Sequence, residues 1–298
     1  MASGYLHTRC AVLAAERASC IVTEDAYLFG SQGPDPLYML GIFPLRLKSR
    51  PLPYGSMLHT ARTGLFLVRL CALAKEKSEI EKAYAMGFLT HYALDSTVHP
   101  YVNTHSLDAN GNYQSALHVR LENNWDALYS NRIGLSKTPD AQFEAVVNAK
   151  PCWEVVAALL SNAMLSVYPE NPLLPGEILT AFQGVEKFGR LKRSRSIYGL
   201  AYLLERLMRK PMFLTAQFIR RKPDTDDHEN KARKPWRSLS QPDRIRDEGL
   251  AELFETAVDT SCSLLRAADS FFAGELPMDT FAVSIGNIGY DTGVESLP

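Results

Sequence analysis

Histidine and aspartate recur at every fourth position in the stretch His91-Tyr-Ala-Leu-Asp95-Ser-Thr-Val-His99-Pro100. A second stretch, His118-Val-Arg-Leu-Glu122, repeats that spacing. Four residues of α-helix advance about 400° and about 6 Å, so the polar side chains of each stretch lie along one face of a helix. Two such faces set opposite each other can hold more than one divalent metal ion. The spacing therefore predicts helices packed around a metal cluster.

The surroundings of the first stretch indicate burial. Leu89, Ala93, Leu94 and Val98 flank its polar side chains, and a buried charge needs a partner or a metal. For either stretch alone, the simpler interpretation is a pair of residues on a helix surface, which stabilises a helix by about 0.2–0.5 kcal/mol. The two stretches together favour a metal site, because imidazole and carboxylate are the usual ligands of hydrolytic zinc.

Helical periodicity extends on both sides of this region. Ala83 and Gly87 precede His91 at the same four-residue step, and their small side chains allow a neighbouring helix to approach closely. No segment shows a strand pattern strong enough to build a sheet. We expect an all-α, multi-helix bundle that encloses a multinuclear zinc site in a single domain, residues 1–298. The helices are expected at 59–74, 79–98 (ending at His99-Pro100), 151–168, 177–188, 196–209 and 250–272.

Two segments stand apart from the helices. Residues 220–240 are charged and contain the basic run Lys231–Arg237 with Trp236, which predicts an exposed loop or a disordered insertion. The tail after Pro277 has scattered apolar residues that could strap across the bundle, and its position is left open.

Composition excludes several classes of protein. The formal net charge of −1 provides no global field toward nucleic acid or anionic membranes. Neither a secretory signal nor an apolar run of membrane-spanning length is found. The five cysteines are odd in number and lack CxxC spacing, so we interpret them as buried thiols in a reducing compartment. The chain is therefore expected to be cytoplasmic.

Two upstream residues are further candidates. Asp35 follows Gly30-Ser-Gln-Gly33-Pro34 and precedes Pro36, so we expect a rigid, extended loop that fixes its carboxylate. The alternative for this segment is a plain glycine–proline turn. His59 follows Gly55-Ser-Met-Leu at a helix start, where a capping or core histidine is the alternative.

At these residues the sequence resembles the zinc-dependent phospholipase C family, part of a wider all-α group that includes single-strand-specific fungal nucleases. The resemblance covers about the first 125 residues, from His7 through a Gly-Pro-Asp loop and a Met-Leu-His to the two stretches above. It implies two or three Zn²⁺ ions. The first zinc would be held by Asp35, His59, His91 and Asp95, the second by His99, His118 and Glu122, and the third by His7 with Asp95 as a bridge.

The third site is where the sequence departs from the family. Secreted members gain a free terminal amine after processing, whereas this sequence begins Met1-Ala-Ser-Gly. The third site is thus left open between a weak site, no site, and one completed by water or by a side chain such as Glu24. Four tyrosines could line a substrate pocket, although packing is the simpler role for each: Tyr38, Tyr54, Tyr92 and Tyr101.

The expected reaction is zinc-dependent hydrolysis of a phosphodiester by an activated water, with a phospholipid headgroup as one candidate substrate. Asp35 is the candidate for orienting or deprotonating that water. One alternative is a nuclease or nucleotidase of the same architecture, in which Lys231–Arg237 and Trp236 grip a single strand. Another is a non-catalytic, metal-stabilised interaction protein. The three ligands expected at the second zinc favour catalysis, unless His105 completes that site.

Overall fold

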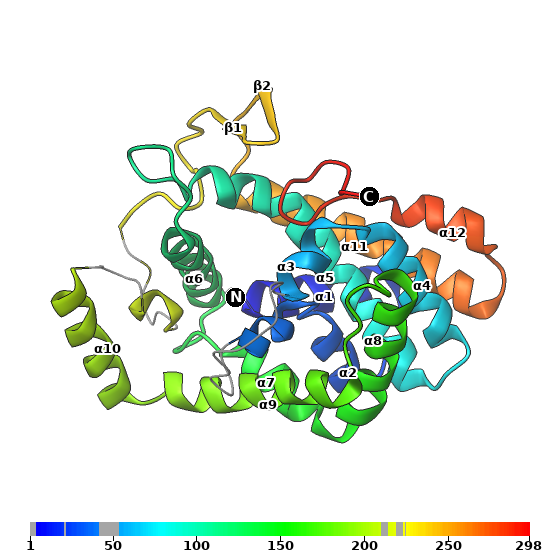
Figure 1. The fold of residues 1–298 in the computed structure, drawn as a ribbon. Coiled ribbons are helices and arrows are strands. Elements are labelled where there is room, and N and C mark those ends of the chain that lie inside the picture. The colour runs from blue at the N-terminus through cyan, green and yellow to red at the C-terminus, as the bar shows by residue number, and fades with distance from the viewer. Residues whose placement is uncertain (1–3, 21, 42–53, 210–213, 219–222, 224) are drawn as a thin grey trace.

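The chain forms a bundle of helices in this computed structural model, which describes residues 4–20, 22–41, 54–209, 214–218, 223 and 225–298 (Figure 1). The elements, in chain order, are α1 (Gly4–Ala18), α2 (Glu24–Gly30), η1 (Asp35–Gly41), α3 (Tyr54–Thr60), α4 (Thr63–Lys75), α5 (Glu79–Thr104), α6 (Ser115–Arg132), α7 (Ala141–Asn148), η2 (Lys150–Cys152), α8 (Trp153–Val167), α9 (Pro175–Lys192), α10 (Arg195–Met208), η3 (Thr215–Gln217), β1 (Trp236–Ser238), β2 (Gln241–Arg246), α11 (Leu250–Ala273) and α12 (Met278–Ile285). Within the described residues, β1 and β2 form a single antiparallel hairpin. The expected all-α class is confirmed.

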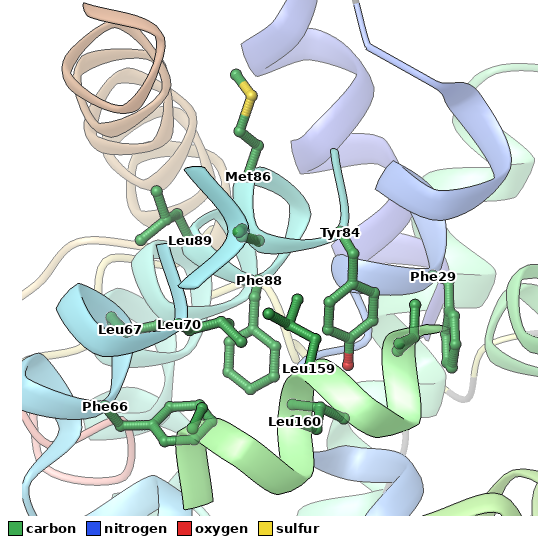
Figure 2. Packing of buried hydrophobic residues seen from close by; sticks show 14 of the residues in the cluster. Phe29, Phe66, Leu67, Leu70, Tyr84, Met86, Phe88, Leu89, Leu159 and Leu160 are labelled. Atoms are coloured by element: carbon green, nitrogen blue, oxygen red, sulfur yellow. The ribbon is translucent and has the colours of Figure 1, made fainter. Parts of the chain in front are cut away.

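Helix α5 is the centre of the bundle. It is buried along most of its length and packs against α1, α2, α4, α8 and α11. Apolar residues occur all around it, as in helices enclosed by a protein core. In Figure 2, Phe88 points toward α4 and α8, and the Tyr84 ring lies beside that of Phe29 in α2, with centroids 5.2 Å apart. A capping box begins the helix, with the backbone N–H of Ser78 donating to Glu81 over 3.2 Å.

Two glycines bring α2 and α5 into close contact. A Cβ atom on Gly30 would lie 2.1 Å from the carbonyl oxygen of Tyr84, and one on Gly87 would lie 2.1 Å from that of Tyr27. Neither position has room for a side chain. The expectation that small residues on this face admit a neighbouring helix is confirmed, and α2 is that helix.

The expected helix end at Pro100 is wrong, because α5 continues to Thr104 with the proline inside it. Tyr101 and Val102, which follow the proline, are buried, and the Tyr101 ring lies 5.7 Å from that of Trp125 in α6. Packing of this last turn outweighs the hydrogen bond that proline cannot donate. The helix expected at 59–74 is instead two, α3 and α4, because Arg62 between them has the left-handed φ of 50°.

The basic segment is a loop over residues 225–235, where Lys231, Arg233 and Lys234 are exposed, and it continues into the β1–β2 hairpin, which we did not expect. Residues 219–222 and 224 lie outside the described residues, but the rest leads into β1, where Trp236 is only 5% exposed. The indole Nε1 of Trp236 donates to the Glu248 carbonyl over 3.1 Å, and the Arg246 guanidinium lies 4.5 Å from its ring. The hairpin thus folds onto the bundle, while the neighbouring lysines and arginines remain exposed.

The tail after Pro277 forms α12 and then crosses the bundle. Tyr290 is fully buried, and its backbone N–H donates to the carbonyl of His59 over 2.8 Å. The side chain of Asn103 in α5 donates to the carbonyl of Asp291 over 2.7 Å. These two hydrogen bonds hold the tail against the face of α5 that bears the polar residues. Among the described helices, none combines the length and apolar character needed to span a bilayer.

Candidate metal centre

Helix α5 presents Asp95 and His99 to a cavity of about 600 Å³, and His91 lies fully buried one turn before Asp95. The other predicted site residues reach the same place from separate elements: His7 from α1, Asp35 from η1, His59 from α3, and His118 and Glu122 from α6. The structure therefore brings all eight together.

Asp95 is the centre of the cluster. Its Oδ2 atom lies 2.9 Å from Nε2 of His91 and 3.3 Å from Nε2 of His59. Its Oδ1 atom lies 3.2 Å from Nε2 of His7 and 3.4 Å from Nε2 of His99. One carboxylate thus faces four imidazoles that are all nearly inaccessible to solvent.

Glu122 occupies the corresponding position on α6. Its Oε1 atom lies 3.3 Å from Nε2 of His99 and 3.2 Å from Nε2 of His118. Three sets of side chains have ligand atoms within 4.8 Å of one another: His7, His91 and Asp95; Asp35, His59 and His91; and His99, His118 and Glu122. The cluster can therefore offer three ligands to each of several cations.

The Nδ1 contacts of His59 and His91 indicate which nitrogen of each ring faces the carboxylates. Nδ1 of His59 is 2.7 Å from the Gly55 carbonyl, and Nδ1 of His91 is 3.2 Å from that of Ser31. A carbonyl can only accept, so in the neutral ring Nδ1 carries the proton and Nε2 offers a lone pair. In that form the lone pair faces a carboxylate, and a metal cation between the two acceptors would satisfy both.

Unsatisfied polar atoms agree with this interpretation. Within the described residues, no hydrogen-bond partner is found for Nε2 of His91, Oδ1 of Asp95 or Oε2 of Glu122, although all three atoms are buried. Buried polar atoms are ordinarily paired. Imidazole nitrogens and carboxylate oxygens are the donor set of hydrolytic zinc, so the residues present fit that metal.

The charges of the cluster are strongly coupled. Burial disfavours the cationic form of His99, but Asp95 together with hydrogen bonds to Asp291 and Glu122 raises its pKa well above the usual value. Burial also disfavours the Asp95 carboxylate, yet His91, His99 and His7 hold its pKa well below the usual range. Negative carboxylates are therefore retained in a buried site, which favours cations there.

The loop before Asp35 differs from our expectation. Asp35 begins the 3₁₀ helix η1 and does not lie in an extended segment. Gly33 has a φ of 53°, and a Cβ atom on it would lie 2.3 Å from the His91 ring. The glycine is needed both for the left-handed turn and for the room that His91 occupies.

The sequence did not reveal Asp291. Its Oδ1 atom lies 3.2 Å from Nδ1 of His99, a residue 192 positions earlier in the chain. The aspartate belongs to the tail, whose local pattern gave no metal-ligand spacing. Asn103 and Tyr113 were also missed, and both contact Nδ1 of His118, at 3.2 and 3.0 Å.

Other candidates lie away from the cluster. His105 stacks on Tyr101 with ring centroids 3.9 Å apart, and it belongs to none of the three ligand sets. Glu24 is exposed at the start of α2. Of the four tyrosines considered for a pocket, Tyr38 lines the cavity, whereas the others do not. Residues 1–3, where the family's third site would be completed, lie outside the described residues.

Comparison with known families gives one result. A family model described as zinc dependent phospholipase C matches residues 14–166, just over half of the chain. The match includes every clustered residue except His7 and Asp291. Neither a curated protein nor a solved structure matches the chain.

Proposed function

Because the chain belongs to the zinc-dependent phospholipase C family, we propose that it hydrolyses a phosphodiester bond of a phospholipid-type substrate. The observation that carries this proposal is the position of Asp95. Its carboxylate faces four imidazole nitrogens at 2.9–3.4 Å beside a cavity large enough for a phosphorylated headgroup. A merely structural cluster would not need the open cavity.

The proposed ligands come from two sets, in which every residue except the buried His91 lines the cavity. Asp35, His59 and His91 would hold one zinc with Asp95, and His99, His118 and Glu122 would hold a second. His7 lies with His91 and Asp95 and would contribute to a third. We therefore propose two or three ions. Zinc bound at such positions lowers the pKa of water toward neutrality and withdraws charge from phosphoryl oxygens.

Asp35 is our candidate for the general base. It lines the cavity, and its Oδ1 atom lies 3.6 Å from Nε2 of His59. From this position the carboxylate would orient the attacking water and accept its proton. Attack of the water on phosphorus would break the bond to the leaving alkoxide. The ring of Tyr38 and the hydroxyl of Ser56 also line the cavity and would contact the substrate.

The alternatives receive less support. Trp236 is buried against Glu248 and Arg246, so its ring is not free to stack on a base, as the nuclease interpretation required. His105 does not complete the set formed by His99, His118 and Glu122. Three protein ligands beside a cavity are typical of a catalytic zinc, whereas structural zinc sites are closed by four.

Metal analysis of untagged, dialysed protein by plasma mass spectrometry tests this function. We expect two or three zinc ions per chain and hydrolysis in a screen of phosphodiester substrates. The D95N variant is expected to lose turnover and at least one zinc ion, whereas D243N, a substitution of an exposed aspartate in β2, is expected to keep the zinc content and turnover of the wild type. Wild-type turnover in D95N, or no zinc bound after zinc is offered back, would refute the proposal.

A further inference from the structure

Helix α10 carries an exposed apolar face. Leu200, Leu203, Leu204 and Leu207 follow the spacing i, i+3, i+4, i+7 and therefore lie on one side of the helix. Their exposed fractions are 56%, 53%, 39% and 72%. A helix normally turns such a face toward the core, and contiguous apolar patches on protein surfaces usually mark interaction sites.

The opposite side of α10 is fixed to the protein. Ala201 and Glu205 are its buried residues, and the helix packs against α9 and η3. The carboxylate of Glu205 accepts hydrogen bonds from the backbone N–H groups of Leu214 and Thr215, both at 2.6 Å. These charge-assisted bonds hold the leucine face outward, so its exposure belongs to the fold.

The same contacts join α10 to the metal centre. Asn123, the neighbour of Glu122 on α6, donates its side-chain N–H to the Ala216 carbonyl of η3 over 2.7 Å. Glu205 of α10 binds Thr215 of that short helix through both its backbone and its hydroxyl. A surface bound by α10 would thus be held at a set position relative to the cavity.

Basic residues are concentrated in and before α10. Three of them pair with acidic residues of α9, the N-cap of α7 and α7 itself: Arg190 with Glu186, Lys192 with Asp140 and Arg193 with Glu144. In residues 190–209, Glu205 is the sole acidic residue, and it is buried, whereas the basic residues are Arg190, Lys192, Arg193, Arg195, Arg206 and Arg209. Arg195, Arg206 and Arg209 are exposed and form no ion pair with any described residue. The formal net charge of the whole chain is −1, so this concentration of positive charge is local.

We propose that α10 docks the protein onto an anionic lipid surface, with its leucines in the acyl boundary and its arginines at the headgroups. Leucine on one side and arginine on the other is the pattern of helices that lie in the plane of a membrane interface. Exposed Tyr198 and Tyr202 border the arginines, and tyrosine rings favour that interface. A second copy of the chain would cover the leucines but would leave the unpaired arginines without an anionic partner, whereas an anionic lipid surface provides for both.

Co-sedimentation of the intact protein with vesicles tests the proposal. We expect binding to vesicles of phosphatidylcholine mixed with phosphatidylglycerol, and much weaker binding to phosphatidylcholine alone. The double variant L203E/L207E is expected to lose binding more than tenfold. Replacing Arg206 by Gln should weaken it about fivefold, since each arginine near an anionic surface contributes about that factor.

The matched control is L165E, because Leu165 on α8 is 55% exposed but lies outside the patch. It is expected to bind vesicles as the wild type does. Equal binding of L203E/L207E and wild type would overturn the proposal. So would concentration-dependent dimers in sedimentation velocity that L203E/L207E abolishes, since the leucine face would then belong to a second copy.

The inference goes beyond the proposed hydrolysis and can fail independently of it. Zinc content and turnover of a short-chain, water-soluble phosphodiester should be the same in L203E/L207E and wild type. Vesicle binding without any turnover in the wild type would support docking while refuting the proposed function. Turnover of the soluble ester without vesicle binding would support the function and overturn docking.

Discussion

Asp291 contacts one nitrogen of the His99 ring, and Glu122 faces the other. The Oδ1 atom of Asp291 is 3.2 Å from His99 Nδ1, and the Oε1 atom of Glu122 is 3.3 Å from His99 Nε2. A carboxylate in this position orients a ligand histidine and increases its basicity, and losing it typically costs about 10–100-fold in metal affinity. We expect D291N to lower zinc affinity by that factor. Competition with a fluorescent chelator measures it without relying on turnover.

A suitable control is D279N, because Asp279 is exposed in the first turn of α12 and contacts no clustered residue. Its zinc affinity should equal that of the wild type. An unchanged affinity in D291N would mean that packing alone orients His99 and that the carboxylate is dispensable.

Cysteine reactivity provides a second prediction for single residues. Burial raises the pKa of the Cys10 thiol to about 12, with the Ser261 hydroxyl only 3.5 Å from its sulfur. At pH 8 this thiol is protonated and therefore unreactive, since the thiolate is the nucleophile. Iodoacetamide should label the half-buried Cys20 first in the folded protein and leave Cys10 unlabelled. Peptide mass spectrometry locates the label.

All five cysteines are free thiols in the structure, so denaturant should expose each of them to the reagent. Labelling of Cys10 as fast as Cys20 under native conditions would show that α1, which also carries His7, opens readily from the bundle.

Local spacing was sufficient to predict most of the cluster. His91, Asp95 and His99 share a face because helix geometry fixes their positions relative to one another, and a helix is the strongest signal in a sequence. Asp291 gave no such signal. It reaches His99 through the fold of the tail, which hydrogen bonds to His59 and Asn103 determine and which no periodicity encodes.

The close crossing of α2 and α5 leads to a prediction about how these two helices pack. A methyl group at Gly87 would lie 2.1 Å from the Tyr27 carbonyl, and backbone on both sides leaves it no room. G87A should therefore force the helices apart and reduce the free energy of unfolding by about 1–3 kcal/mol or more. His91 lies one turn further along α5, so zinc affinity should fall as well. Denaturant unfolding and zinc titration measure the two effects.

Gly176 on α9 provides the matched control, because nothing lies within 4 Å of the Cβ atom that alanine would add. G176A should leave zinc affinity unchanged and raise stability by about 0.4–1 kcal/mol, since alanine restricts the unfolded chain. If G87A were as stable as G176A, the close helix crossing would not contribute to stability.

Helix ends were harder to predict than helices. Proline at position 100 predicts a terminus, but burial of Tyr101 and Val102 against the neighbouring helix and hairpin extends α5 by one turn. The hairpin was missed for a related reason. Its charged sequence favours an exposed loop, whereas long-range contacts hold it on the bundle: Trp236 packs on Tyr101 at 5.2 Å between centroids, and the Thr104 hydroxyl donates to the Arg237 carbonyl over 2.8 Å.

At the scale of the whole molecule, the net charge does not determine the charge of each part of the surface. The value of −1 argued against an attraction to anionic membranes, yet it is a sum over 298 residues. Beyond about 10 Å, salt screens exposed charges from one another, so a surface responds to the local arrangement. The arginines around α10 therefore act separately from the acidic residues elsewhere in the chain.

Removal of metal should destabilise the entire bundle. The cluster joins α1, η1, α3, α5 and α6, so ions bound there would stabilise the folded chain over the unfolded one. Free zinc at about 100 times its dissociation constant contributes about 2.7 kcal/mol for one site. Each kcal/mol shifts the melting temperature by about 2–4 °C in domains of about 150–250 residues, so we expect chelation to lower it by at least about 5 °C. Added zinc should restore it, as calorimetry can measure.

The D95N variant distinguishes the stabilisation that comes from bound zinc from other effects of the chelator. Asp95 faces His7, His59, His91 and His99, so its replacement should remove the zinc that it helps to hold, and chelation should then lower the melting temperature less than in the wild type. The same melt tests whether residues 1–298 form one domain, which predicts a single cooperative transition that moves as a whole. Two transitions, of which chelation lowers only one, would instead place the cluster in a unit that unfolds separately from the helices after residue 166.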